Sequence, residues 1–217
     1  MKGKAALLVT LLCIAAVAPA TAMATIVSFG ATYGYSGTAP AAATPPSWLT
    51  TQFNDHDASG SVTLTLSATN LTGTEFVGEW YLNLDPTLSP NNLHFSTPTK
   101  VGSFDDPTVS TGVDQFKADG DGYFDIYLDF ATSAGDSSRF TAGDSVSYII
   151  DGISSLTANS FKFLSATGGG EGIYPMAAHV QNTPGGGVYS GWVSVPEPSV
   201  LLLLSTGMAG LLGYGRL

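Results

Sequence analysis

The residues best suited to chemistry in this sequence are three aspartates set among glycines near the middle of the chain. The run reads Asp119-Gly120-Asp121-Gly122-Tyr123-Phe124-Asp125. Carboxylates at i, i+2 and i+6 on a loop bent by glycine can give a hard cation several oxygen ligands, so Asp119, Asp121 and Asp125 form a candidate calcium site. The spacing is not that of an EF-hand loop, because the glycine comes too early and no glutamate closes it. A plain turn that opens the next strand is the alternative interpretation.

A second polar cluster, Asn54-Asp55-His56-Asp57, is either a metal or acid–base site or a solvated loop. The histidines of the chain, His56, His94 and His179, lie far apart and lack the i, i+4 spacing of a zinc motif. The sequence contains no G-x-S-x-G motif, the nucleophile elbow that presents the serine in many Ser-His-Asp hydrolases. These patterns give no indication of a catalytic centre.

Glycoside cleavage would need a pair of carboxylates poised in a cleft. Glutamate is scarce, and the chain contains only Glu75, Glu79, Glu171 and Glu197. Glu75 and Glu79 flank the start of a predicted strand, where we expect both side chains to face solvent. We therefore expect no enzymatic activity, and a secreted hydrolase is retained as an alternative.

Aromatic side chains offer a different kind of site, because their rings can stack against sugars. The candidates for such a platform are Trp48, Trp80, Tyr81, Tyr174, Tyr189 and Trp192. The alternative is that these rings fill the core of a β-sandwich, since aromatic side chains carry much of the apolar surface that a core buries.

Composition narrows the class of protein. The chain has 217 residues, of which 44% are hydrophobic and only 11% charged, and its net charge is −10. Loss of Lys2 and Lys4 with an N-terminal signal would leave five basic residues against 17 acidic ones, a net charge of −12. Nucleic-acid binding is disfavoured, because it needs Lys and Arg at the phosphates. Cys13 is the only cysteine and lies within that signal, so the remaining chain can form no disulfide or thiolate metal site.

Short strands separated by turns must position these residues. The predicted strands are 26–35, 61–69, 76–84, 123–130, 145–150, 160–164, 177–181 and 191–195, with a weak strand at 100–104 and one helical turn at 47–53. In 123–130 the Tyr and Asp residues alternate with apolar ones, which predicts a polar outer face and an apolar inner face. No long segment has a helical period. We expect an all-β chain with a single β-sandwich or jelly-roll domain over 25–194.

The N-terminus has the three parts of a secretory signal peptide in the right order. Lys2 and Lys4 supply the positive charge, 5–17 is apolar, and Ala22-Met23-Ala24 is a small-residue cleavage signal. A cut after Ala24 is expected, and a cut after Ala22 is the second option. The signal should form a helix that precedes the sandwich.

The C-terminus carries a second candidate targeting signal, after the signal peptide at the N-terminus. Pro196-Glu197-Pro198 precedes an apolar run of about 13 to 16 residues, which as a helix spans roughly 20–24 Å against a hydrocarbon core of about 30 Å. The prolines stop a helix from extending backwards and keep the motif extended. We expect a short hydrophobic helix within 195–217 that anchors the chain to a membrane transiently.

This C-terminal segment resembles the PEP-CTERM sorting signal of Gram-negative bacteria that make exopolysaccharide. The resemblance covers about the last 22 residues, with Pro196, Glu197 and Pro198 as the sorting motif, although the family usually ends in several basic residues and this chain offers Arg216. It implies recognition by an exosortase-type processing enzyme and release or transfer to the outside.

These observations predict an exported, non-enzymatic protein of the cell envelope, outer surface or extracellular matrix, associated with exopolysaccharide. A secreted module that binds calcium or carbohydrate is the alternative.

Overall fold

Alternation of apolar and polar residues produces the strands, and β4 (Val62–Ser67) is the clearest example. Val62, Leu64 and Leu66 are fully buried on this strand, and the residues between them are half-buried. The computed structural model describes residues 24–41, 47–133, 137–170, 172–184 and 189–196. Within these ranges the chain forms thirteen strands and two short 3-10 helices, η1 (Pro90–Asn92) and η2 (Ala158–Phe161). The described chain is therefore all-β, as predicted.

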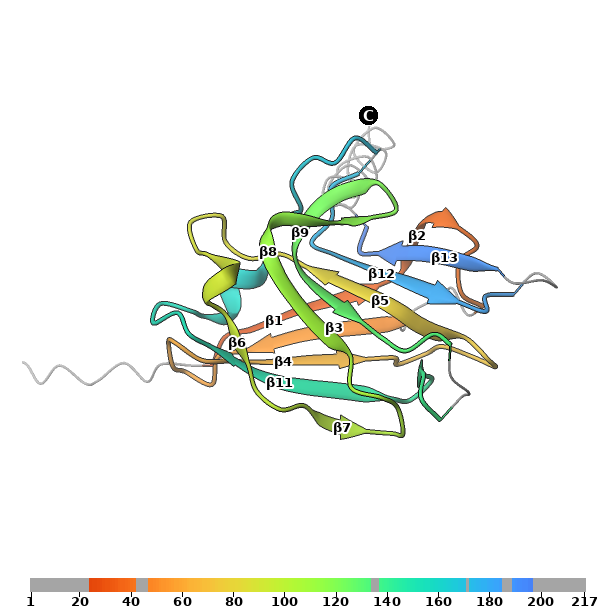
Figure 1. Ribbon diagram of the computed structural model, residues 1–217, viewed down its shortest axis with the longest axis horizontal. Coiled ribbons are helices and arrows are strands. Elements are labelled where there is room, and N and C mark those ends of the chain that lie inside the picture. Colours follow the sequence, from red (N-terminus) through yellow and green to blue (C-terminus); the bar gives the residue numbers. More distant parts are fainter. Residues whose placement is uncertain (1–23, 42–46, 134–136, 171, 185–188, 197–217) are drawn as a thin grey trace, which may run out of the picture.

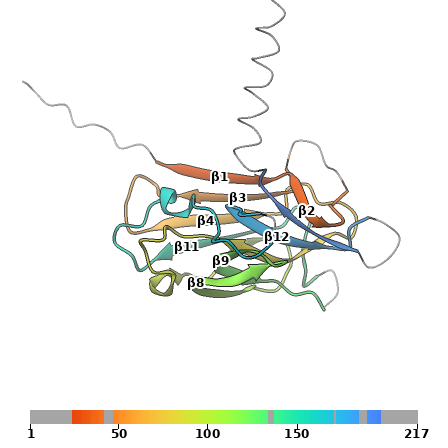
Figure 2. The same cartoon turned by 90° about the horizontal axis from the view of Figure 1, so that it is seen from above.

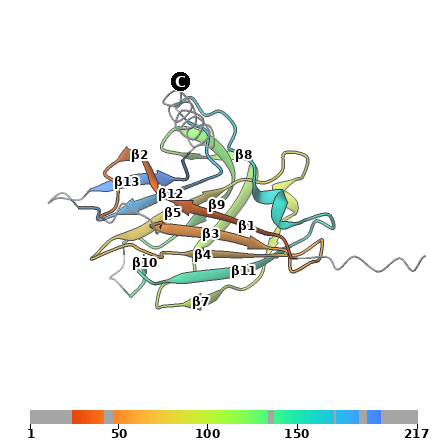
Figure 3. The same cartoon turned by 180° about the vertical axis from the view of Figure 1, so that it is seen from behind.

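Six strands form the first antiparallel sheet, called sheet A. Their spatial order is β1 (Ile26–Ala31), β3 (Leu49–Asn54), β4, β11 (Ser145–Asp151) and β6 (His94–Phe95), with β7 (Thr99–Val101) also paired to β11. Figure 3 shows β1, β3, β4, β11 and β7 in succession. β1 pairs with β3 alone along its described length, so it is an edge strand of this sheet.

Seven strands form the second antiparallel sheet, called sheet B. Their order is β2 (Tyr33–Gly37), β13 (Ser190–Ser194), β12 (Met176–Gln181), β5 (Phe76–Leu82), β9 (Asp121–Asp129) and β8 (Thr108–Ala118), with β10 (Phe140–Thr141) also paired to β5. The predicted strand at 26–35 is in fact two strands, because the chain passes from sheet A to sheet B at Thr32. In Figure 1 the long β8–β9 hairpin rises past the other strands of sheet B and bends at its tip.

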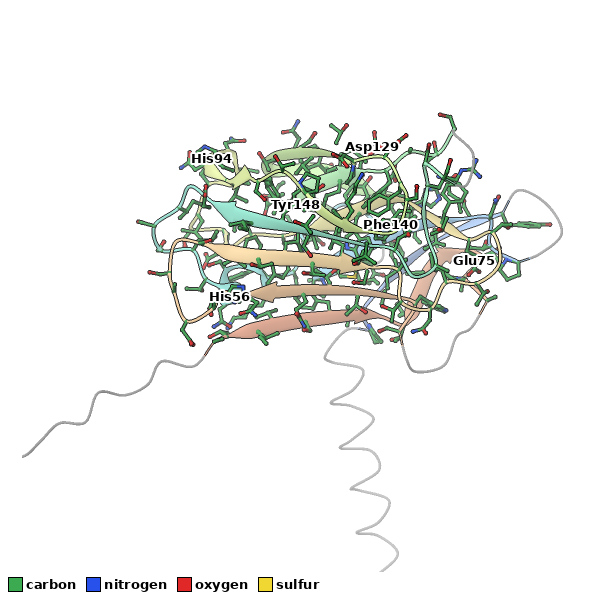
Figure 4. The ribbon with its side chains drawn as sticks, turned by 90° about the horizontal axis from the view of Figure 1, so that it is seen from below. His56, Glu75, His94, Asp129, Phe140 and Tyr148 are labelled. Carbon is green, nitrogen blue, oxygen red and sulfur yellow. The ribbon has the colours of Figure 1, made fainter. Side chains whose placement is uncertain are left out.

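The two sheets enclose one large apolar core, so the domain is a β-sandwich. Trp80 of β5 is fully buried, and its indole N–H donates a 3.1 Å hydrogen bond to the hydroxyl of Thr51 on β3, which ties the sheets together. Phe140 and Tyr148, labelled in Figure 4, both belong to this core. Figure 2 shows the molecule from above, with β1 at one side and β8 at the other. Among the residues that the structure describes, this core and the partly buried side chains against it run from Val27 to Val195.

Two local predictions were wrong, and one long strand was missed. The segment predicted as a helical turn at 47–53 contains β3, because its Leu49, Thr51 and Phe53 are all buried in strand alternation. The strand predicted at 160–164 is instead η2 followed by irregular chain; a capping box between Thr157 and Ser160 starts the 3-10 helix. β8 was not predicted, because its register with β9 is broken and its sequence does not alternate.

The flanking segments lie mostly outside the described residues. Of the expected signal peptide over 1–24 only Ala24 is described, and of the expected sorting motif only Pro196 is described. The expected terminal helices therefore fall outside the description. No helix in the described ranges is long and apolar enough to cross a membrane.

Candidate functional site

The outer face of sheet B carries a row of aromatic rings, one from each of several neighbouring strands. We call this the outer aromatic face, and it consists of Tyr35 (β2), Trp192 (β13), His179 (β12), Tyr81 (β5), Tyr127 (β9) and Phe116 (β8). The row exists because antiparallel pairing sets residues of adjacent strands side by side. His179 is paired with Trp192, and Tyr81 with Tyr127.

The rings touch along the row without a break. Trp192 lies 6.5 Å from Tyr35, 5.7 Å from Tyr81 and 4.6 Å from the ring of His179, which is stacked on it at 12°. Tyr81 is 5.0 Å from Tyr127, which in turn is 5.5 Å from Phe116. Contacts of this kind hold each ring in one orientation. The face is therefore a pre-arranged surface and not a set of independent side chains.

The rings are only partly covered. Tyr81 is buried, whereas Tyr35, Phe116, Tyr127 and Trp192 are half-buried. A large ring that is neither in the core nor fully in solvent presents one apolar side to whatever binds the face.

Glu79 provides the polar centre of the face. The hydroxyl of Tyr81 donates to Glu79 Oε2 at 3.2 Å, and that of Tyr127 donates to Oε1 at 3.5 Å. His179 Nδ1 lies 3.9 Å from Oε2. Asp129 of β9 is the cross-strand neighbour of Glu79 and is exposed, as Figure 4 shows. A carboxylate set among rings can accept hydrogen bonds from the hydroxyls of a ligand.

Burial fixes the protonation of these groups. Burial raises the pKa of Tyr81 and of Tyr127 well above the ordinary tyrosine value, and the nearby charge of Glu79 raises both further. Burial lowers the pKa of His179, against the opposing charges of Glu79 and Asp119. At neutral pH the face therefore combines neutral rings, protonated phenol donors and carboxylate acceptors.

One end of the face is closed by the segment that precedes β12. Tyr174 stacks on Tyr35 at 4.5 Å, and Ala166 bridges to Tyr123 of β9. The side chain of Asn83, buried at 2% exposure, donates to the carbonyl oxygens of Phe163, Tyr174 and Pro175 and so fixes this segment. The open part of the face lies towards Trp192 and Tyr127.

The predicted platform of aromatic residues separates into different places. Trp48 and Trp80 belong to the main core, as the alternative interpretation expected, while Tyr81, Tyr174 and Trp192 belong to the cluster on the outside of sheet B. Tyr189 is 42% exposed just before β13. The sequence prediction missed several members, namely Tyr35, Phe116 and Tyr127 together with His179. The alternation over 123–130 did place Tyr127 on the outer face.

The three aspartates of the calcium prediction are not brought together. Asp119 and Gly120 both have positive φ, 50° and 83°, between the paired residues Ala118 and Asp121. This is the geometry of a two-residue hairpin turn, so the turn interpretation is confirmed. Within the described ranges no group of three or more His, Cys, Asp or Glu side chains is placed to hold a metal ion.

Asp125 has a structural role instead. Its carboxylate is 8% exposed and accepts hydrogen bonds at 2.9 Å from the backbone N–H groups of Leu84 and Asp114. The second bond holds the irregular part of β8, where Asp114 has a φ of 47°. Asp125 was predicted on a solvent-facing side of its strand, but it is buried, where its carboxylate pairs with one N–H group after β5 and one in the irregular part of β8.

The remaining polar candidates lie apart from one another. Figure 4 shows His56 and His94 at one end of the sandwich and Glu75 at the other. Glu75 was expected in solvent, but it is 3% exposed and accepts hydrogen bonds from the backbone N–H groups of Ala41 and Thr72. Asp55, from the cluster expected to be either a site or a solvated loop, is also buried.

Comparisons with protein-family models, curated proteins and solved structures found no match. The fold and the outer aromatic face define a β-sandwich that presents half-buried rings and carboxylates on one sheet.

Proposed function

We propose that the chain is an exported, non-enzymatic protein of the cell surface or extracellular matrix, and that it binds polysaccharide through the outer aromatic face. The observation that carries the binding proposal is the unbroken row of rings around Glu79. A sugar ring offers a C–H face that packs on an aromatic ring, together with hydroxyls that need hydrogen-bond partners. The outer aromatic face supplies both kinds of partner.

The two terminal addresses support export and sorting. The segment 1–24 has the order of a secretory signal, and 195–217 has the motif Pro196-Glu197-Pro198 with an apolar run behind it. An exosortase-type enzyme would process the second address, and the apolar run would serve as a transient membrane anchor until then. The described residues of the core run from Val27 to Val195, so they all lie after the expected cut at Ala24 and before the motif Pro196-Glu197-Pro198.

Charge indicates which polysaccharides are favoured. The chain after signal removal has a net charge of −12, and Glu79 and Asp129 lie on the face itself. Acidic chains such as nucleic acids or uronate-rich polymers would be repelled. We therefore expect a neutral polysaccharide as the preferred ligand.

A secreted hydrolase is the second candidate, favoured by one observation. Glu79 and Asp129 are direct cross-strand neighbours on the aromatic face, and glycoside hydrolysis uses two carboxylates. Binding without cleavage is preferred here, because each oxygen of Glu79 accepts one hydrogen bond from a phenol hydroxyl and keeps a lone pair for a ligand hydroxyl, an arrangement that suits an acceptor more than a nucleophile.

The binding proposal is tested by electrophoresis in gels that contain neutral exopolysaccharide from the native host. The wild-type chain should be retarded, and Trp192→Ala should weaken the apparent affinity about tenfold or more, the loss of one stacking partner. The matched control is Ile149→Ala on sheet A, where the side chain is 52% exposed. Equal retardation of the wild type and both variants would contradict polysaccharide binding by the outer aromatic face.

The hydrolase alternative is tested on the same polymer by assay of new reducing ends. The proposal predicts none from the wild-type chain. Release of reducing ends that is abolished by Glu79→Gln would establish the second candidate in place of the first.

A further inference from the structure

Asp55 is a buried carboxylate that faces the first residue after the expected signal-peptide cut. It follows β3 directly and is 6% exposed. Its Oδ1 accepts a 2.8 Å hydrogen bond from the backbone nitrogen of Thr25, and its Oδ2 accepts one at 3.3 Å from that of Ala158. The backbone N–H of Asp55 donates in return to the carbonyl oxygen of Thr25 at 3.3 Å.

A buried carboxylate is stabilised by hydrogen bonds, and further by a cationic partner, because burial of an isolated charge is costly. The ion pairs found among the described residues do not include Asp55. Burial would raise the pKa of Asp55, but hydrogen bonds from the backbone N–H groups of Thr25, Ala158 and Asp57 hold it below its ordinary value. In the uncleaved chain the Asp55 carboxylate is therefore an anion whose hydrogen-bond donors are all neutral backbone N–H groups.

Removal of the signal peptide changes the donor at Thr25. Hydrolysis of the Ala24–Thr25 bond uses one water, which leaves a carboxylate on Ala24 and puts its two protons on the nitrogen of Thr25. The single peptide N–H becomes an α-ammonium with three N–H groups and a full positive charge. The atom that receives this charge is the one already hydrogen-bonded to Asp55 Oδ1.

We propose that Asp55 is the receptor for the new N-terminus, and that an ion pair between Asp55 and the Thr25 ammonium locks the sandwich after the signal peptide has been removed. The inference rests on the proposed export, and it deepens it by choosing between the two cleavage signals. A cut after Ala22 would place the ammonium on Met23, two residues before Thr25. Only a cut after Ala24 places it on the Thr25 nitrogen, which is hydrogen-bonded to Asp55.

The lock joins three elements at one corner of the sandwich. Thr25 precedes β1, the edge strand; Asp55 follows β3; and Ala158 begins η2. Phe161 of η2 stacks on Phe53 of β3 at 4.2 Å, so the corner is packed around the ion pair. A charged hydrogen bond is stronger than a neutral one. The processed chain should therefore hold β1 against the sheet more firmly than the precursor does.

The test compares two chains that both run to Leu217. One begins at Thr25 with a free amino group, released from a removable fusion, and the other begins at Met23. Thermal unfolding at pH 6.5 should show the Thr25 chain melting about 2–4 °C higher. In the Asp55→Asn background the two chains should melt together.

A pH series supplies a second readout, needed if Asp55→Asn does not fold. An ammonium stabilised by an ion pair contributes fully below its unfolded pKa of about 8, and its contribution is lost as the pH rises through its higher folded pKa. The advantage of the Thr25 chain should therefore disappear at alkaline pH, and acetylation of its amino group should remove the advantage at pH 6.5.

Equal melting of the two chains at every pH would overturn the lock. That result would leave export untouched, because both chains are made with defined N-termini and no host processing is involved. A host product that starts elsewhere would also overturn Asp55 as the receptor of the new N-terminus, even if the two chains differed in melting temperature.

Discussion

Single carboxylates in this protein have roles that depend on which backbone N–H groups surround them. Three carboxylates, those of Asp55, Glu75 and Asp125, are buried. Each accepts hydrogen bonds from two backbone N–H groups, most of which belong to residues far away in the sequence. Such bonds satisfy irregular backbone that no strand partner reaches. Glu79 differs, because its donors are the side chains of Tyr81 and Tyr127 on an open face. That difference makes Glu79 the carboxylate suited to meet a ligand.

His179 should make the stability of the protein depend on pH. Burial lowers its pKa below the ordinary value of 6.5, so the unfolded chain binds a proton that the folded chain resists. The free energy of unfolding should therefore fall as the pH drops from about 7 through the lowered pKa. Urea unfolding of the wild type and of His179→Gln at pH 7.5, 6.5 and 5.5 measures this. The wild type should lose more stability than the variant, and parallel curves would contradict the assignment.

At the scale of elements, the β8–β9 hairpin shapes the outer aromatic face. Asp119 and Gly120, which form its turn, both have positive φ. Further along, Thr111 pairs with Ile126 and Phe116 with Phe124, so the chain advances five residues on β8 but only two on β9. The hairpin therefore twists strongly, which turns Phe116 towards Tyr127. The face depends on this irregular hairpin as well as on regular pairing.

The turn can be tested at Gly120. A Cβ there would meet no atom within 4 Å, so the cost of Gly120→Ala comes only from its φ of 83°. We expect a loss of about 1 kcal/mol, the cost of a left-handed conformation for a residue with a Cβ. Asp119→Asn is the control, because Asn-Gly suits the same turn, and it should leave the melting temperature nearly unchanged. A fall in stability with Asp119→Asn as large as with Gly120→Ala would show that the carboxylate matters, as the calcium hypothesis required.

The elements that alternate regularly were predictable, and those shaped by tertiary contacts were not. The strand at 61–69 and the core positions of Ile126, Leu128 and Phe130 follow from a period of two, which survives because each strand has one face in the core. Phe124 was predicted on the same inner face, but it packs in the cluster of Tyr81 and Tyr127. β8 escaped prediction because its extra residues break that period. η2 escaped because the capping box from Thr157 to Ser160 is a short-range signal within a sequence that also suits a strand.

The candidate site was predictable only in part, for a related reason. Trp192 and Tyr81 were recognised as aromatic candidates, but sequence alone does not distinguish a ring in the core from one on the outer face. Trp80 and Tyr81 are neighbours in the chain and lie on opposite sides of sheet B. Tyr35, Phe116 and His179 were missed because only the strand order places them beside Trp192 and Tyr127.

At the scale of the whole molecule, we propose that a secretion signal and a sorting signal flank the β-sandwich. The described residues of the core lie within 27–195, the proposed new N-terminus would meet Asp55 at one corner, and the proposed sorting motif begins at Pro196, directly after β13 and Val195. The proposed order is export, removal of 1–24, sorting through the C-terminal motif, and attachment to polysaccharide by the outer aromatic face.

The most direct test of this account is the intact mass of the protein recovered from the outer surface and medium of its native host. We predict a chain that begins at Thr25 and lacks the segment beyond Pro198, and a Glu197→Ala variant that retains the C-terminal run. A wild-type product that keeps residues 200–217 would contradict sorting by this motif, and a product that keeps 1–24 would contradict export by the N-terminal signal.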